Sequence, residues 1–413
     1  MEFEQVKIFV LNRGSSSIKC DVYEFVNLPH KPIQPLWKAR LQWKNSFEEA
    51  TLKIKNDKGE EYVEKIRERS AGQALPYLIK FLVEGKVAIL TSLKEIEMIG
   101  HRIVHGGREF KKSVPIDTKV KEKILQLSEL APLHNLPELQ GIEILEKFFR
   151  GVPQVAVFDT AFHHSLPKKA AIYPGPYEWY EQGIQRYGFH GISFQYCAKR
   201  AGEILKQDLR SRKTVICHLG SGASLCAVKE GKSVDTTMGF TPLEGLMMDT
   251  RSGSIDPGII LYLQDKKKKS SKEVAHELYK KSGLFGVSGA SSDMRDILEK
   301  SERGNPRATL ALDIYIHRLN ACIGSMIASL QGLDVLIFAA GIGENASFIR
   351  EKVCENFSFL DLKLDRAKNQ LSSTKDRDLS ARGSKVKLLV IHTEEAFEIA
   401  RECWEEWTNA KDK

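Results

Sequence analysis

The sequence predicts an α/β protein made of two similar halves, each with a mixed β-sheet. Two segments half a chain apart, residues 8–20 and 215–227, share one pattern: an apolar strand, a tight turn of glycines and serines, and a second strand. Apolar strand-like runs also alternate with stretches of helical spacing along the chain. The length of 413 residues exceeds what one hydrophobic core usually supports, so we expect two domains.

In the first half, residues 33–70 alternate apolar and charged positions, which is typical of exposed antiparallel strands. Residues 72–92 and 119–149 carry apolar side chains three and four positions apart, which predicts helices. Residues 154–160 form a short apolar run with Asp159 at its tip. We expect a buried strand that delivers this carboxylate to a site, with the exchange between domains just after it.

The second half repeats this order of strands and helices. Its glycine-rich segment, residues 340–345, follows a strand and precedes a helix that should carry Ile349 and Val353 on one face. The expected strands of this half are residues 214–236, 333–338 and 386–391, and the expected terminal helix is residues 394–407.

The two Gly/Ser turns are candidate phosphate sites. Glycine lets backbone N–H groups approach an anion without a Cβ in the way, and serine hydroxyls add donors. Two such turns in one chain suggest a duplicated fold that holds a polyphosphate from both sides.

The formal net charge of +8 raises the question of nucleic-acid binding. Lysines and arginines are spread along the chain, and the one dense run, residues 266–269, continues into a stretch of helical spacing. A solvated loop that enters a helix explains this run better, because no recognition fold or interleaved aromatic residue accompanies it. We therefore expect no nucleic-acid partner, although the positive charge suits an anionic substrate.

The seven cysteines are scattered and show no CxxC or His-paired metal spacing. They are typical of small buried residues in a reducing compartment. The first residues are acidic and run straight into a strand, which predicts no signal peptide, and no apolar run reaches the roughly 18 residues of a membrane span. We expect a cytoplasmic protein that does not bind membranes.

Nine segments together resemble the motifs of one family, and they cover nearly the whole chain. A lone glycine motif would be weak support, but so many matches in one order are very unlikely by chance. The sequence resembles the acetate kinases, members of the superfamily of acetate and sugar kinases, heat-shock cognate proteins and actin. The segments are residues 12–19, 101–107, 131–135, 158–163, 186–191, 238–245, 250–257, 291–295 and 340–345.

The resemblance implies two actin-like ATPase domains of the ribonuclease H-like type, with mixed sheets and a cleft between them. The N-terminal lobe would comprise residues 1–160 plus 396–413. The C-terminal lobe would comprise residues 161–395 and carry the nucleotide and dimer surfaces. A homodimer is the implied assembly.

The implied reaction is reversible transfer of a phosphoryl group from ATP to acetate, directly and in line, giving acetyl phosphate and ADP with Mg²⁺ or Mn²⁺. Such a reaction needs alignment and charge neutralisation more than covalent help. Arg102 and Arg251 are the expected cations, because a guanidinium grips a carboxylate or phosphate with two N–H bonds. By the resemblance, His190 stabilises the transferring group. The implied catalytic set is Arg102, Asp159, His190 and Arg251, and the implied magnesium ligands are Asn12, Asp159 and Glu395.

The resemblance also implies two binding regions. The segment at residues 340–345 argues for ATP over pyrophosphate as the donor. The implied phosphate and nucleotide residues are Asn12, Ser15, Ser17, Lys19, His218, Gly220, Ser221, Gly222, Asp293, Met294, Arg295, Gly341, Ile342, Gly343, Glu344 and Asn345. The implied acceptor residues are Arg102 and His134 with a small apolar pocket of Val104, Leu133, Phe189 and Pro242. One extra methylene in such a pocket changes binding by only about 1–3 kcal/mol, so acetate should be preferred without propionate being excluded.

Several of these residues have simpler explanations. An isolated arginine is by default a surface ion-pair residue, and His134 is also compatible with a structural histidine. Glu395 also fits an acid in a first helical turn, favoured by the helix dipole. Strand alternation alone leaves the direction of Lys19 open.

The sequence departs from the family pattern at six positions: Ile192, Phe194, Ser221, Asp249, Ser254 and Glu394. Ser221 replaces an asparagine and offers one donor instead of two, and a carboxylate at position 249 could pair with Arg251 or repel phosphate. Three hypotheses follow: an active acetate kinase, a propionate or other short-chain acyl kinase, and a nucleotide-binding paralogue of low activity. The first hypothesis is favoured by five retained residues: Arg102, Asp159, His190, Arg251 and Glu395. The departures led by Ser221 and Asp249 are the sequence support for the third.

Overall fold

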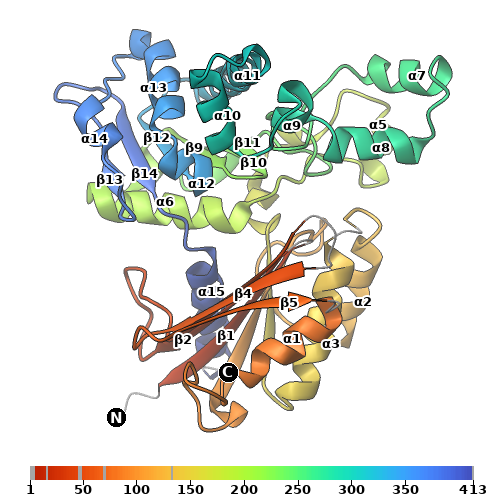
Figure 1. The fold of residues 1–413 in the computed structure, drawn as a ribbon, viewed down its shortest axis with the longest axis vertical. Helices are drawn as coiled ribbons and strands as arrows, with labels where there is room; N and C mark the ends of the chain where they lie inside the picture. The colour runs from red at the N-terminus through yellow and green to blue at the C-terminus, as the bar shows by residue number, and fades with distance from the viewer. Residues whose placement is uncertain (1–4, 15–16, 45–48, 68–70, 132–133, 412–413) are drawn as a thin grey trace. The chain divides into compact units, whose positions relative to one another are not determined.

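The computed structural model describes residues 5–14, 17–44, 49–67, 71–131 and 134–411. The chain divides into two compact units (Figure 1). The first unit comprises Met1–Ala161 and Glu394–Lys413, and the second comprises Phe162–Thr393. The chain therefore crosses between units twice, once after Ala161, two residues beyond Asp159, and once just before the terminal helix.

The first unit contains a sheet with the strand order β5-β4-β3-β2-β1-β6-β8-β7. Strands β1 to β5 pair antiparallel to their neighbours, whereas β6 runs parallel to β1, and β8 parallel to β6. The strands are β1 (Val6–Arg13), β2 (Ser17–Phe25), β3 (Trp37–Lys44), β4 (Glu49–Asn56), β5 (Glu61–Arg67), β6 (Ile96–Ile103), β7 (Val114–Pro115) and β8 (Gln154–Phe158).

Helices cover both faces of this sheet (Figure 1). An added Cβ at Gly100 on β6 would lie 2.6 Å from Cys403 of α15, and one at Gly141 of α3 would lie 2.9 Å from Leu11 on β1. Gly100 pairs with Val10, the neighbour of Leu11, and neighbouring strand residues point to opposite faces. The helices are α1 (Ala71–Lys80), α2 (Thr118–Leu127), α3 (Asn135–Phe148) and α15 (Glu395–Lys411), with a 3₁₀ turn at η1 (Leu93–Glu95).

The second unit repeats the arrangement of the first. Its sheet order is β11-β10-β9-β12-β14-β13, in which β11, β10 and β9 pair antiparallel and β9, β12 and β14 run parallel. This matches β3-β2-β1-β6-β8 strand for strand in order and direction. The strands are β9 (Thr214–Leu219), β10 (Ala223–Lys229), β11 (Lys232–Thr236), β12 (Val335–Ala339), β13 (Arg377–Asp378) and β14 (Lys387–Ile391).

The helices of the second unit lie on both sides of its sheet, with α6 below the strands in the view of Figure 1 and α11 and α13 above them. The helices are α4 (Lys168–Ala171), α5 (Tyr177–Glu181), α6 (Gly191–Leu205), α7 (Pro257–Asp265), α8 (Ser271–Lys280), α9 (Gly283–Ser288), α10 (Met294–Glu302), α11 (Pro306–Leu330), α12 (Ala340–Asn345), α13 (Ser347–Asn356) and α14 (Arg366–Gln370). The 3₁₀ turns are η2 (Ala161–Ser165), η3 (Leu209–Ser211) and η4 (Ser358–Leu360).

Several local expectations hold and two need correction. Within residues 33–70, the described part forms the antiparallel strands β3, β4 and β5, and residues 45–48 and 68–70 lie outside the described residues. The lysine run at 266–269 leads into α8, which begins with a capping box of Ser270 and Glu273. The helix expected at residues 72–92 ends at Lys80, after which the chain turns. The one expected at 119–149 is two helices, α2 and α3, joined by residues 128–134.

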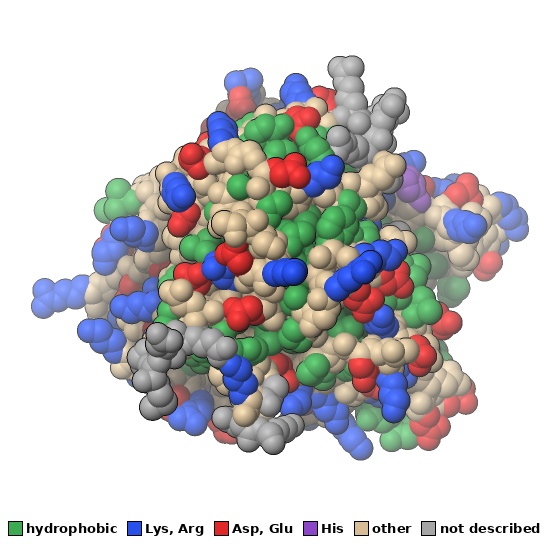
Figure 2. Space-filling model, turned by 90° about the horizontal axis from the view of Figure 1, so that it is seen from below, with side chains coloured by type: hydrophobic (Ala, Val, Ile, Leu, Met, Phe, Trp, Pro, Cys, Tyr) green, Lys and Arg blue, Asp and Glu red, His purple; other side chains and the backbone are tan. Residues whose placement is uncertain are grey.

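Charged side chains are mixed by sign on the surface shown in Figure 2, where basic and acidic groups alternate among those drawn in colour. No helix within the described residues is both long and apolar enough to pass through a membrane.

Candidate functional site

Four polar side chains of the first unit form a cluster around Arg102. Arg102 Nη2 donates to Asp159 Oδ2 at 2.5 Å, and its Nη1 donates to Asn12 Oδ1 at 3.4 Å. Asn12 Nδ2 in turn donates to Glu395 Oε2 at 3.3 Å. Asp159 and Asn12 are buried and Arg102 is largely so. The implied metal ligands and the implied acceptor arginine therefore lie together.

The sheet topology explains why these residues meet. Asn12, Arg102 and Asp159 stand at the carboxyl ends of β1, β6 and β8, which are parallel neighbours, so they share one edge of the sheet. Arg102 lies two residues after Gly100, on the face that α15 covers. Glu395 is the first residue of that helix, which places its carboxylate at the same edge.

Opposing effects act on the charge of Arg102. Burial disfavours the guanidinium cation, but the carboxylates of Asp159 and Glu395 outweigh this effect and raise the pKa of Arg102. The arginine therefore stays positive throughout the physiological pH range.

The oxygens of Asn12, Asp159 and Glu395 fit a hard divalent cation. Mg²⁺ prefers oxygen ligands and keeps several waters, so two carboxylates and an amide oxygen suffice. No group of three or more His, Cys, Asp or Glu side chains placed to hold a metal occurs within the described ranges. The two carboxylates and the amide are oxygen donors of the kind that a magnesium ion with several bound waters accepts.

The first Gly/Ser turn joins β1 to β2. Gly14 N donates to Ser17 O at 2.9 Å, and Ser17 is half-buried, whereas Ser15 lies outside the described residues. Lys19 is exposed and pairs directly across the strands with Asn12. Directly opposed antiparallel residues share a face, so the open question of its direction is answered: Lys19 lies on the same face as Asn12.

A second cluster lies in the second unit, around two stacked histidines. The rings of His190 and His218 lie 4.2 Å apart at 19°. Each ring is held by a serine at 2.8 Å: Ser224 Oγ contacts His190 Nδ1 and Ser193 Oγ contacts His218 Nδ1. His190 itself has a left-handed backbone conformation, with φ of 58°, directly before α6. These contacts fix the orientation of both imidazole rings through their Nδ1 atoms. The Nε2 atom of each ring points away from its serine.

Arg251 and the second Gly/Ser turn complete this cluster. A Cβ built on Gly222 would lie 3.4 Å from His190 Nε2 and 3.5 Å from Arg251 Nη1. Arg251 Nη1 also donates to Pro242 O at 2.9 Å. Bare backbone, an imidazole nitrogen and a guanidinium thus meet at one point, which is the combination of donors that a phosphate group requires.

The carboxylate of Asp249 is directed at the backbone N–H of Thr250 rather than at the guanidinium of Arg251. Its Oδ1 accepts the N–H of Thr250 at 2.6 Å, and its own N–H donates to Ser221 O at 3.4 Å. Burial raises the pKa of Asp249, while Thr250 and Arg251 oppose that shift. This departure from the family pattern therefore acts on Arg251 at most through charge.

Three of the other departures, Ile192, Phe194 and Ser254, have simple structural roles. Ile192 and Phe194 are buried core residues of α6. Ser254 Oγ accepts the N–H of Gly245 at 3.0 Å. Each of these side chains thus serves packing or local backbone geometry.

The implied acceptor residues come from both units. Val104 and Phe189 are buried, with exposed fractions of 4% and 1%, and His134 is half-buried directly before α3. Pro242 is half-buried and accepts the hydrogen bond from Arg251. Leu133 lies outside the described residues.

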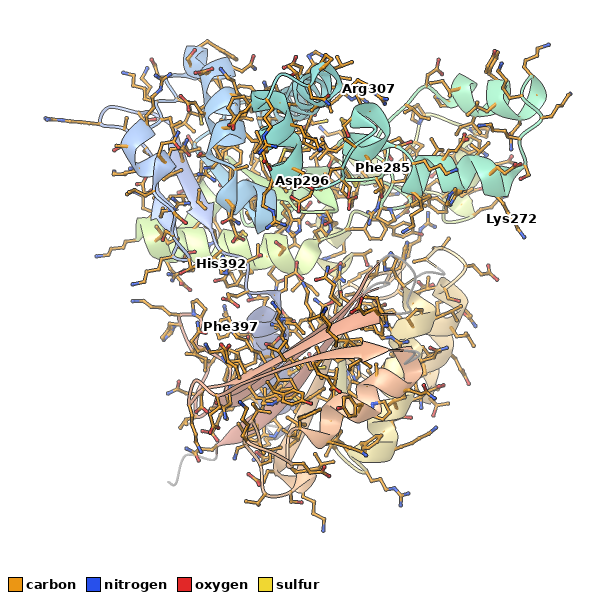
Figure 3. The ribbon with its side chains drawn as sticks, in the orientation of Figure 1. Lys272, Phe285, Asp296, Arg307, His392 and Phe397 are labelled. Atoms are coloured by element: carbon orange, nitrogen blue, oxygen red, sulfur yellow. The ribbon has the colours of Figure 1, made fainter. Side chains whose placement is uncertain are left out.

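The glycine-rich segment after β12 is itself the short helix α12. Its acid, Glu344, is turned inward: it accepts hydrogen bonds from the imidazole of His392, labelled in Figure 3, and from Thr393 N at 3.1 Å. The buried Arg350 donates to the carbonyls of Gly343 and Glu344, both at 2.9 Å. The Glu344 side chain therefore anchors the segment, and Gly341 and Asn345 form its other side, joined by a hydrogen bond of 2.8 Å.

Asp293 and Arg295 form an exposed pair at the start of α10. Asp293 Oδ1 accepts the N–H of Arg295 as the helix N-cap, and the guanidinium of Arg295 lies 2.5 Å from Oδ2. Met294 between them is buried. The pair is accessible to a ligand, whereas Met294 supports the helix.

Comparison with known proteins identifies the family of this chain. The chain matches the acetokinase family over residues 7–401. The chain belongs to the acetokinase family. This membership places it among the acetate kinases, and its α/β fold with two mixed sheets is the actin-like ATPase fold.

Individual relatives cover almost the full chain. Acetate kinases of Microcystis aeruginosa and a Nostoc species are 52% and 50% identical, each over 97% of this chain and 99% of the relative. Among solved structures, the acetate kinase of Porphyromonas gingivalis has a TM-score of 0.88 at 38% identity. A propionate kinase from Francisella tularensis has a TM-score of 0.87, also at 38% identity. Both structures match 97% of this chain and 99% of their own.

Sequence reasoning missed one ionisable group of this acetokinase-family chain beside the first cluster. Glu138 in α3 is 2% exposed, and its Oε2 accepts the N–H of Val104 at 3.0 Å. A signal was present, because Glu138 stands four positions before Ile142 and seven before Leu145, on the apolar face of the helix. A carboxylate at such a position indicates either a paired charge or a functional group.

Proposed function

We propose that this protein transfers the terminal phosphoryl group of ATP to acetate directly and in line, reversibly, giving acetyl phosphate and ADP. Membership of the acetokinase family supports the reaction class. The observation that carries the mechanism is the meeting of His190, Arg251 and the bare backbone of Gly222. Phosphoryl transfer depends on such preorganised donors, because the protein must neutralise charge as the group moves.

In this proposal the acceptor acid binds at Arg102. Its guanidinium is held by Asp159 and Asn12 and keeps its positive charge, so it can grip a carboxylate without being displaced. We assign Val104, Leu133, His134, Phe189 and Pro242 to the small pocket for the methyl group. The size of this pocket sets the preference for acetate over longer acids.

His190 acts as a hydrogen-bond donor to the transferring group. If Ser224 Oγ donates to His190 Nδ1, the ring proton resides on Nε2, the nitrogen that faces Gly222. Arg251 lies beside it and offsets the equatorial charge of the phosphoryl group. His218 supports the ring of His190 by stacking.

The nucleotide and its metal complete the site. Mg²⁺, with Mn²⁺ as a substitute, bound through Asn12, Asp159 and Glu395, supplies positive charge for the phosphate oxygens of ATP. We assign Ser15, Ser17 and the exposed Lys19, at and after the first turn, and Gly220, Ser221 and Gly222 of the second turn to contacts with phosphates. Adenosine would lie against the outer side of α12, where Gly341 and Asn345 are exposed and Ile342 is half-buried, with the exposed pair of Asp293 and Arg295 beside it. Gly343 and Met294 are buried and would support this surface from behind.

A hydroxamate assay of acyl phosphate formation tests the reaction with acetate, propionate and butyrate. We expect the fastest product formation from acetate, dependent on ATP and Mg²⁺. Arg251→Ala and Asp159→Ala should each lower turnover by orders of magnitude, because each removes charge from the transferring group or its metal. Arg303→Ala is the control, since Arg303 is an exposed arginine that pairs only with the helix neighbour Glu299 in the described structure. Full turnover in either site variant would remove the role assigned to it.

A propionate kinase is the second candidate. The match to the Francisella tularensis propionate kinase is as close in fold as the match to an acetate kinase. In the same assay, a higher kcat/KM for propionate than for acetate would favour this function. Binding of ATP without product from any acid would favour a nucleotide-binding paralogue instead.

We also propose a homodimer that works in the cytoplasm. Helix α7 has no fully buried residue and exposes the apolar side chains of Ile259, Leu261 and Tyr262. Such an exposed apolar surface is typical of a contact with another protein. We propose that α7 packs against a second copy of the chain. The seven cysteines all lie within the described residues, none of them forms a disulfide and six are buried, which suits a reducing compartment.

A further inference from the structure

Glu138 is a buried acid next to the proposed acceptor site, and none of the roles above accounts for it. The first turn of α3 holds the two residues that follow Arg102 and Ile103: Glu138 Oε2 accepts the N–H of Val104 at 3.0 Å, and Asn135 Oδ1 accepts the N–H of His105 at 3.1 Å. The other carboxyl oxygen of Glu138, Oε1, is buried and has no hydrogen-bond partner among the described residues.

Two arginines lie near Glu138, yet neither donates to it within the described structure. Arg13 Nη1 donates a hydrogen bond to Pro137 O at 2.6 Å, and its Nη2 donates one to Gln140 Oε1 at 3.4 Å. The Nη atoms of Arg102 donate hydrogen bonds to Asp159 and Asn12. Its Nε atom is buried and has no hydrogen-bond partner among the residues described. Glu138 is therefore not held there as half of an ion pair.

The surroundings of Glu138 favour its neutral form. Burial is the largest influence and raises its pKa to about 8, and the charge of Asp159 acts in the same direction. Arg102, the N–H of Val104 and Arg13 oppose the shift. At neutral pH the side chain is mostly a carboxylic acid, whose carbonyl oxygen can still accept the hydrogen bond from Val104.

We propose that Glu138 is a positioning and specificity residue for the acceptor acid: it holds the Val104 backbone in place and, by staying uncharged, leaves the charge of Arg102 to the incoming carboxylate. This inference rests on the proposed function, in which Arg102 and Val104 bind the acceptor. An ionised Glu138 would place a second anion beside Arg102 and repel acetate. Acetate binding should therefore weaken as Glu138 loses its proton.

Steady-state kinetics from pH 6.5 to 9.5 test this assignment. In the wild-type protein we expect the KM for acetate to rise several-fold above pH 8, while the KM for ATP stays level. Glu138→Gln is neutral at every pH and keeps an oxygen for Val104, so its KM for acetate should stay within about twofold across the range. Glu143→Gln, an exposed glutamate of the same helix, is the matched control and should follow the wild type.

Glu138→Ala separates positioning from charge. It leaves the N–H of Val104 without its acceptor, and an unsatisfied buried group of this kind costs enough to raise the KM for acetate about tenfold at all pH values, with kcat within about threefold. A purely structural role would instead lower kcat and raise both KM values together. That pattern, or a Glu138→Gln profile that superimposes on the wild type, overturns the proposal.

Thermal unfolding gives a readout that does not need activity. The folded state keeps the Glu138 proton up to about pH 8, whereas the unfolded state loses it near the ordinary value of 4.5. The contribution of this group is therefore full below pH 4.5 and is lost as pH rises through 8. The Tm of Glu138→Gln relative to the wild type should rise from pH 5 to pH 9, and a constant difference would refute the charge argument.

The two proposals can fail separately. If the wild-type protein forms no hydroxamate from any acid, the proposed function fails and the role of Glu138 fails with it. If the wild type is active but Glu138→Gln retains the wild-type dependence of acetate KM on pH, only the assignment of Glu138 is wrong.

Discussion

At the scale of single residues, Gly222 matters because of the side chain that it lacks. His190 Nε2 and Arg251 Nη1 both face its Cα, at 3.4 and 3.5 Å from the position of an added Cβ. Those distances are ordinary van der Waals contacts, so an alanine fits the protein without ligand. A methyl group there would instead occupy the space proposed for a phosphate.

Gly222→Ala should therefore leave the Tm nearly unchanged and weaken nucleotide binding. We expect the KM for ATP to rise about tenfold or more, because the methyl group separates phosphate oxygens from the backbone N–H groups. Gly324→Ala is the control, since an added Cβ at Gly324 in α11 meets nothing within 4 Å. An unchanged KM for ATP in Gly222→Ala would show that the second turn does not hold phosphate.

Single residues also show where sequence reasoning reaches its limit. Asn12, Arg102 and Asp159 were recognised in three separate motifs, and the structure brings Asn12 and Asp159 each within hydrogen-bonding distance of Arg102. The spacing of Glu138 from Ile142 and Leu145 placed it on the apolar face of its helix, but its neighbours were not predictable, because they depend on how α3 packs against β1 and β6. The direction of Asp249 likewise depends on a backbone N–H that only the folded turn presents.

At the scale of elements, α7 presents apolar residues where a surface helix would normally be polar. Leu261 and Tyr262 are 62% and 53% exposed, and α8 is the helix that lies beside them in this unit (Figure 1). Exposed apolar helices of this kind usually mark contacts with other proteins. A contact between two copies of α7 would be isologous and would close as a dimer.

Leu261→Lys should weaken the proposed dimer, because a charge would have to be buried in an apolar contact. We expect analytical ultracentrifugation to show a dimer for the wild type and at least a tenfold higher dissociation constant for the variant. Leu371→Lys changes an equally exposed leucine outside α7 and should leave the mass unchanged. A monomeric wild type, or an intact dimer in Leu261→Lys, would contradict the proposal.

Elements differ in how well the sequence predicts them. Strands with strict alternation or continuous apolar runs, such as β4 and β12, appear where expected, because their periodicity is local. The helix boundaries near Lys80 and Ser128 were missed, because the apolar spacing continues past the point where the chain turns.

At the scale of the whole molecule, duplication is the main organising feature. The hairpins β1–β2 and β9–β10 occupy equivalent places in sheets of the same order and direction, so the two Gly/Ser turns are equivalent as well. The sequence pattern predicted the paired hairpins. The parallel additions of β6, β8, β12 and β14 could not be predicted in the same way, because they join strands far apart in the sequence.

Each repeat contributes a different part of the proposed chemistry. The first unit holds the acceptor arginine and the metal ligands, and the second holds His190, Arg251 and the second turn. We propose that both clusters serve one reaction and that the units close on their substrates, which would keep water from consuming ATP. Neither unit alone should then catalyse transfer.

The most direct test of this central claim is a crystal structure of the protein with ADP, Mg²⁺, acetate and a planar mimic of the phosphoryl group in transit. The proposal predicts that the mimic lies between ADP and acetate, with the guanidinium groups of Arg102 and Arg251 and the Nε2 atom of His190 all within hydrogen-bonding reach of the bound ligands. A mimic bound with either arginine remote from those ligands, or with acetate placed away from Arg102, would contradict it.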